Sequence, residues 1–232
     1  DQALKLLNIL LTIVTSLGSV MLPRVSNLLS LGNQKAVNKL HEMSFLVYNL
    51  VIFPMIAGIL IVNKDFVNFF LGQDFQEARY AIAIMVFRMF FIGWTNIMGI
   101  QILIPHNKNR EFMLSTTIPA FFSVGLNILL IPSLGYVGAS IVSLATEGLV
   151  WLIQLYFTRS YLKEIKILPS MLKILVASLV MYGILYVIQP LLHFPSVVSV
   201  LISALLGLII YAGLVLMLRV LDFEELKSVF KK

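Results

Sequence analysis

The feature that most constrains this chain is a series of long apolar runs separated by short polar stretches. A helix needs about 20 consecutive apolar residues to cross the hydrocarbon core of a membrane. Seven segments satisfy this length: 3–22, 44–63, 79–104, 112–131, 136–158, 170–189 and 196–220. Only 12% of the residues are charged, about half the share that is usual in soluble domains. The sequence therefore predicts an all-α fold, a polytopic bundle of about seven spanning helices.

The basic residues predict how this bundle is oriented. Loops on the cytoplasmic side of a membrane carry an excess of Lys and Arg. Twelve of the 17 basic residues fall in the odd-numbered connections and the C-terminal tail, whereas Lys64 and Arg79 alone fall in the opposite connections. We therefore expect a multi-pass protein of the cytoplasmic membrane with a cytoplasmic C-terminus. The net charge of +6 is explained by this asymmetry, so we expect no nucleic-acid partner.

The first connection is longer than the others and combines positive charge with apolar residues at helical spacing. Arg24, Lys35 and Lys39 supply the charge, and Val25, Leu28, Leu29, Ala36, Val37, Leu40 and Met43 supply the apolar positions. This pattern is typical of an amphipathic helix that lies in the membrane interface. We therefore expect an interfacial helix near 23–43, with a solvated loop containing one helical turn as the alternative.

Two charged residues fall deep within predicted spanning helices. Arg88 lies about 13 Å below the outer end of the third segment and Glu147 about 16 Å below the outer end of the fifth, at 1.5 Å per residue. At such similar depths the two can meet. Intramembrane charges mark either a functional path or a pair that makes both charges tolerable. One hypothesis is a structural ion pair, and the other is that Arg88 faces an aqueous cavity and attracts a phosphate.

Small and polar residues form a stripe on each of three consecutive predicted helices. At 100° per residue the stripes contain Thr95 and Asn96 beside Arg88, Asn127 on the fourth segment, and Ser143 and Gln154 beside Glu147. Gln101 falls on the opposite side of the third segment and is left out. Such stripes would face a cavity or each other rather than lipid. The last two segments are almost entirely apolar, as expected of peripheral, lipid-facing helices.

Catalytic and metal-binding patterns are missing from the sequence. It contains no cysteine and no GxxxxGK[ST], HExxH or GxSxG motif. His41, His106 and His193 are scattered over three connections, whereas metal ligands cluster. We therefore expect no enzymatic activity, no metal and no cofactor.

Three stretches of the sequence carry a family resemblance. They are LPRVSNLLSLG, FFLGQDFQEARYAIAIM and LNILLIPSLGYVGASIVSLATEG. Together they resemble the polysaccharide-export branch of the multidrug/oligosaccharidyl-lipid/polysaccharide exporter superfamily, the Wzx-type flippases of capsule and O-antigen repeat units. The most specific part is the run N-x-x-LIP-x-x-G-x-x-GA followed by an acid in the same helix, Glu147.

The resemblance implies a MATE-like plan of two six-helix lobes with two added C-terminal helices. Residues 1–160 would then form five spanning helices of the C-terminal lobe, and 161–232 the two peripheral helices with a cytoplasmic tail. The chain begins with Asp1, already within an apolar run. We therefore expect a fragment that lacks the N-terminal lobe.

The resemblance also implies a function. Such proteins translocate polyprenyl-pyrophosphate-linked oligosaccharides by alternating access, driven by a Na⁺ or H⁺ gradient or by the membrane potential. Arg88 is then the candidate that faces the pyrophosphate, and a polysaccharide polymerase or chain-length regulator is an expected partner.

Two further branches of the superfamily stay open as alternatives, a lipid II flippase and a cation-coupled multidrug exporter. A different class, a membrane-embedded polysaccharide polymerase or acyltransferase, would need a catalytic cluster on an exported loop. The longest such loop, NKDFVNFFLGQDFQEAR, contains acids but no histidine.

Overall fold

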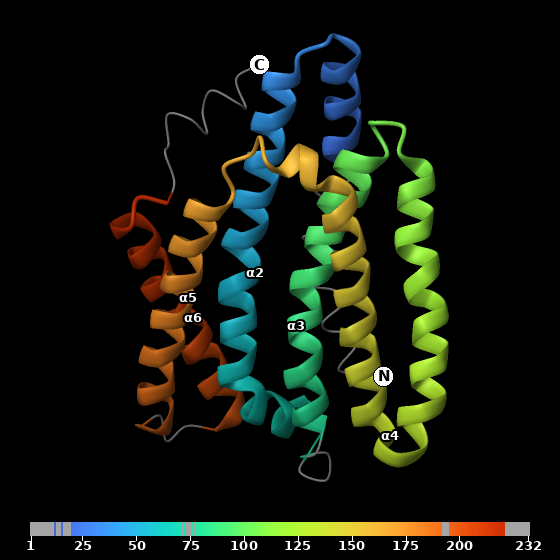
Figure 1. The fold of residues 1–232 in the computed structure, drawn as a ribbon. Helices are drawn as coiled ribbons and strands as arrows, with labels where there is room; N and C mark the ends of the chain where they lie inside the picture. Colours follow the sequence, from blue (N-terminus) through green and yellow to red (C-terminus); the bar gives the residue numbers. More distant parts are fainter. Residues whose placement is uncertain are drawn as a thin grey trace.

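The structure is a computed structural model that describes residues 12, 15, 20–70, 72, 76, 78–191 and 195–220. Residues 20–30 are helical. They are followed by α2 (Gln34–Phe70), α3 (Ala78–Asn96), the π-helix η2 (Ile97–Leu103), α4 (Asn109–Leu162), α5 (Leu168–Ile188), the short 3₁₀ turn η3 (Gln189–Leu191) and α6 (Ser196–Met217). The chain is thus an all-α membrane bundle over its described part, as predicted (Figure 1).

Five of these helices are long and apolar enough to cross a membrane. The longest, α4, has 54 residues and a non-helical residue, Gly135, with φ 54° and ψ −132°. Only glycine adopts such a backbone readily, and Figure 1 shows the chain reversing there, so that residues 109–134 and 136–162 form two antiparallel arms. These arms are the fourth and fifth predicted segments. The first predicted segment, 3–22, lies mostly outside the described residues.

The connections alternate between the two ends of the bundle. Figure 1 places the turns at 31–33, 104–108 and 163–167 at one end, and the reversal at Gly135 at the other. The basic residues Lys35, Lys108 and Lys163 belong to the first end, which is called the basic end below. Which compartment this end faces stays a prediction.

Helix α2 lies at the centre and divides the bundle into two packed clusters. On one side Phe45, Ile52 and Ile56 of α2 pack against Val86 and Met89 of α3, together with Ile97, Met98 and Ile102 of η2. On the other side Ala57 and Ile61 of α2 pack against α5 and α6 through Ile174, Ala177, Met181, Leu185, Tyr211 and Val215. Helices α5 and α6 therefore attach to the bundle through α2 and each other.

The first connection differs from the interfacial helix predicted near 23–43. The structure ends one helix at Ser30 and begins α2 at Gln34, so the segment consists of two helix ends and a tight turn. Gly32 has φ +68°, its N–H bonds the carbonyl of Leu29, and the N–H of Asn33 bonds that of Leu28, which is a Schellman cap. Asn33 Oδ1 then accepts the N–H of Ala36 and caps α2. These local caps divide the segment into two helices at 31–33, whereas its position in the membrane interface stays a prediction.

The π-helix η2 changes the register of the third predicted segment. Its N–H groups bond carbonyls five residues earlier, as in the 3.1 Å bond from Ile104 N to Gly99 O. One extra residue per turn rotates every later side chain relative to an α-helix. Angles calculated at 100° per residue are therefore wrong beyond Asn96.

Candidate functional site

Arg88 of α3 and Glu147 of the second arm of α4 lie in contact. The guanidinium donates from Nε and Nη2 to a single carboxylate oxygen, Glu147 Oε1, at 3.3 and 3.2 Å. The side chains are 26% and 22% exposed. Nη1 of the guanidinium and the second carboxylate oxygen are thus left without a partner among the described residues. The pair can hold the helices together and still offer hydrogen-bonding groups.

A group of aromatic rings lies one turn from the pair toward the basic end. Trp151, one turn after Glu147, lies 5.7 Å from Phe91 and 6.2 Å from Trp94 between ring centroids. The indole N–H of Trp151 is buried without a hydrogen-bond partner among the described residues. These ring contacts pack α3 against the second arm of α4 one turn from the ion pair.

The other predicted site residues form no hydrogen bond or ion pair with Arg88 or Glu147 in the described part of the chain, and two of them have hydrogen bonds within their own helix. Thr95 bonds the carbonyl of Ile92 in its own helix, and Asn127 bonds Ser123 one turn earlier. Asn96 immediately precedes η2, and Ser143 is half-buried. Thr95 and Asn127 thus form hydrogen bonds within their own helices, which is an alternative to facing a cavity. The roles of these residues toward a substrate stay predictions.

Gln154 belongs to a separate polar contact nearer the basic end. It is 1% exposed, and its Nε2 donates to Ser115 Oγ in the first arm of α4 at 3.1 Å. A Cβ on Gly99 of η2 would lie 3.1 Å from the same amide nitrogen, so the glycine makes room for it. Gln154 Oε1 is buried without a partner in the described part of the chain. This residue joins the two arms and η2.

Sequence reasoning missed a buried polar layer between α2 and η2. Ser44 donates to Gln101 Oε1 at 2.7 Å, and His41 Nε2 lies 3.0 Å from the backbone oxygen of Gln101. Gln101 thus faces α2, whereas Arg88 faces α4, in agreement with its predicted place on the opposite side of the segment. A second missed contact joins Trp94 Nε1 to Asn49 Oδ1 at 3.0 Å. The signal in the sequence that could have indicated these contacts is the presence of polar residues in α2.

The predicted interfacial residues surround the turn at the basic end. Arg24 and Lys35 are exposed, and Lys39 is half-buried. Within the described ranges no group of three His, Cys, Asp or Glu residues lies close enough to hold a metal ion.

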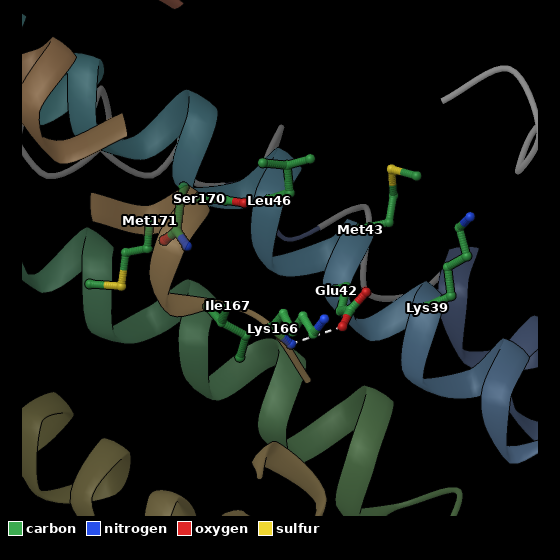
Figure 2. Close-up of a pocket in the computed structure, with 9 residues that line it drawn as sticks. Lys39, Glu42, Met43, Leu46, Lys166, Ile167, Ser170 and Met171 are labelled. Carbon is green, nitrogen blue, oxygen red and sulfur yellow. Dashed lines mark hydrogen bonds between the residues drawn. The ribbon is translucent and has the colours of Figure 1, made fainter. Parts of the chain in front are cut away.

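Two cavities lined by described residues border α2, and neither is lined by Arg88 or Glu147. An apolar groove of about 500 Å³ lies among α2, α5 and α6, beside Pro54, Gly58 and Gly207. A smaller cavity of about 230 Å³ lies at the basic end, between α2 and the start of α5. Figure 2 shows Lys39 and Glu42 on α2 and Lys166 on the connection that leads to α5, with the Lys166 N–H bonded to Glu42.

Comparisons with known proteins bear on the whole chain, although no protein-family model matches it. It is 24% identical over its full length to an uncharacterized membrane protein of Methanocaldococcus jannaschii. Over 93% of the chain it is 23% identical to the "probable low-salt glycan biosynthesis flippase Agl15" of Haloferax volcanii. Over 66% it is 28% identical to a protein of Escherichia coli K12 provisionally named an O-antigen transporter. The chain covers 45%, 46% and 37% of these relatives, so it spans about half of their length or less.

A solved structure shares the fold. The lipid II flippase MurJ, in an inward closed conformation, superposes with a TM-score of 0.76 at 17% identity, over 94% of this chain and 46% of that chain. At this identity the likeness concerns the fold alone. Together with the sequence relatives it agrees with the resemblance that the sequence predicted: the chain is similar in sequence to proteins named as a glycan biosynthesis flippase and an O-antigen transporter, and it shares the fold of a flippase.

Proposed function

We propose that the protein containing this chain is a flippase for lipid-linked glycans, with polyprenyl-pyrophosphate-linked oligosaccharide repeat units as its substrates. The observation that carries the proposal is the similarity, over 93% of the chain, to a protein named as a flippase of glycan biosynthesis. The relative provisionally named an O-antigen transporter supports the same substrate class. The chain covers less than half of each of these two relatives, so the proposed activity belongs to the whole protein.

Within this function Arg88 is our candidate for contact with the pyrophosphate. Its guanidinium is partly exposed and gives two of its donors to one oxygen of Glu147, so further donors remain. A planar guanidinium suits phosphate oxygens. Exchange of Glu147 for a substrate phosphate would let the same arginine hold either partner. Coupling to a Na⁺ or H⁺ gradient or to the membrane potential, and cooperation with a polymerase or chain-length regulator, remain part of the proposal.

The test is transport of labelled lipid-linked oligosaccharide across proteoliposomes that contain the full-length protein. A charge-assisted hydrogen bond contributes about 1.5–3 kcal/mol, so Arg88→Gln should slow transport about tenfold to hundredfold. Arg79→Gln is the matched control, because Arg79 lies on the same helix and bonds the neighbouring Tyr80. The Arg88→Gln/Glu147→Gln double variant separates the two roles of Arg88. Its transport stays slow if Arg88 contacts the substrate, and its transport recovers if the pair is only structural.

Lipid II is a second candidate substrate, because the solved structure with this fold is named for it. The same vesicles loaded with lipid II decide between the two. Failure to move either lipid, with the protein correctly folded, would refute the proposed function.

A further inference from the structure

We propose that the cavity of about 230 Å³ at the basic end binds the phosphate of an anionic membrane phospholipid, as a site separate from any transport path. It is called the headgroup cavity below. Its lining consists of Lys39, Glu42, Met43, Leu46, Asn49, Lys166, Ile167, Ser170 and Met171. The proposal does not depend on what the protein transports.

The charges in the headgroup cavity favour an anion. Lys39 lines the cavity from α2 and Lys166 from the connection between α4 and α5, with Glu42 between them (Figure 2). Glu42 is the opposing charge. Its Oε1 accepts the backbone N–H of Lys166 at 2.8 Å, which holds the connection in place, and it offsets one of the two lysine charges. The net charge of the lining is therefore positive.

Two further donors converge on the same space. Helix α5 begins here at Leu168, and no side chain caps its amino end. Pro169 has no N–H and the N–H of Met171 bonds the Ile167 carbonyl, which leaves the N–H groups of Leu168 and Ser170 at this partly positive helix end. Asn49 is 1% exposed and lines the cavity. Its Oδ1 accepts from Trp94, which leaves its Nδ2 without a partner among the described residues. An amide Nδ2 is a hydrogen-bond donor that a phosphate oxygen can accept from.

The shape and surroundings favour a lipid over a free ion. A volume of about 230 Å³ is several times the roughly 30 Å³ that one water occupies in the liquid, so a phosphate with part of its glycerol fits. Met43, Leu46, Ile167 and Met171 make the rest of the lining apolar. Beside the cavity, Leu168 and Leu172 of α5 are 64% and 50% exposed, which offers a surface for acyl chains. Basic pockets between spanning helices on the cytoplasmic side bind lipid headgroups elsewhere.

The test is the thermal stability of the purified protein in an uncharged detergent, titrated with phosphatidylglycerol, phosphatidylcholine, inorganic phosphate or a polyprenyl pyrophosphate. We expect phosphatidylglycerol to raise the melting temperature at concentrations where phosphatidylcholine and phosphate do not. One basic residue near an anionic membrane contributes about 1 kcal/mol, or about fivefold in affinity. Lys39→Gln and Lys166→Gln should therefore each weaken the response to phosphatidylglycerol about fivefold.

Two variants control for trivial explanations. Lys163→Gln removes the same charge from the same connection, but Lys163 does not line the cavity, so its response should stay within about twofold of the parent. Ser170→Asp places a carboxylate in the first turn of α5, where it favours the helix and repels a phosphate. It should fold normally and lose the response.

Each contrary outcome overturns the proposal. Equal effects of Lys163→Gln and Lys166→Gln would show a general surface attraction instead of a site. An equal response to phosphatidylcholine would show that charge is not recognised. A stronger response to polyprenyl pyrophosphate, lost in the same variants, would assign the cavity to the glycan carrier instead of the phospholipid.

Discussion

Replacing Gly93 by alanine tests the packing between α2 and α3 most directly. The ring of Tyr48, which is 3% exposed, lies where a Cβ on Gly93 would be: the added carbon would overlap Cε2 and Cζ of the ring. The Tyr48 hydroxyl donates to the backbone oxygen of Met89. A methyl group at Gly93 must therefore displace the ring and disturb this bond.

The magnitude follows from three opposing contributions. Forcing a methyl group into a packed core costs about 1–3 kcal/mol, and loss of the hydrogen bond costs about 1 kcal/mol more. Alanine is better than glycine within a helix by about 0.5–1 kcal/mol, which offsets part of this cost. We expect a net loss in the free energy of unfolding of about 1–3 kcal/mol, measured by thermal or denaturant unfolding in detergent micelles.

Gly125→Ala is the control with the opposite sign. Gly125 lies within the first arm of α4, and nothing would lie within 4 Å of an added Cβ, so alanine should be neutral or stabilising. The Gly93→Ala/Tyr48→Leu double variant should lose less than the sum of the two single variants, because the leucine frees the space. The reasoning is refuted if Gly93→Ala is as stable as the parent or if the two changes are additive.

Three further predictions concern the polar contacts of the bundle. Arg88→Glu should lower the free energy of unfolding by about 3 kcal/mol, within the range for an unpaired charge at a helix centre. The exchange Arg88→Glu/Glu147→Arg should recover at least half of this loss in unfolding measurements. No recovery would show that the two residues do not interact as a pair. Asp65 accepts hydrogen bonds from Gln189 Nε2 at 3.2 Å and Ser199 Oγ at 2.8 Å. Asp65→Ala should therefore speed amide hydrogen exchange at the adjoining ends of α5 and α6 more than in α3. Equal changes in both regions would show that these hydrogen bonds do not stabilise the helix ends locally. Gln154→Leu should change the stability by less than about 1 kcal/mol, because it removes an amide with an unpaired oxygen, whereas a loss above 3 kcal/mol would show that this oxygen has a partner.

Much of the fold could be predicted because membrane helices are determined by apolar length. The segments 112–131 and 136–158, and the reversal between them, match the two arms of α4, and Gly135 performs the turn. The termini of α2 could not be predicted in this way. Its 37 residues make about 56 Å at 1.5 Å per residue, well beyond the hydrocarbon core, and polar residues such as Asn38 occur within it.

The candidate site could be predicted only where helix geometry is regular. Arg88 and Glu147 lie in α-helical stretches, so equal depth was a sound guide to their contact. Gln101 lies in η2, and its bonds to Ser44 and His41 depend on which helix packs against that side, which angles within one helix do not show. The headgroup cavity was likewise not predictable, because Lys39 and Lys166 meet only through tertiary packing.

The π-helix η2 also has a consequence for how relatives of this chain are aligned. Its seven residues, Ile97–Leu103, contain one residue more per turn than an α-helix would need. Deleting a single residue there would let ordinary helical bonds form and would turn the Gln101 side chain by about 100°. A homologue with one residue fewer at this point is therefore expected to keep the same bundle. In an alignment, a gap of one position inside this membrane-spanning helix would then reflect a real change of helix type and not an alignment error.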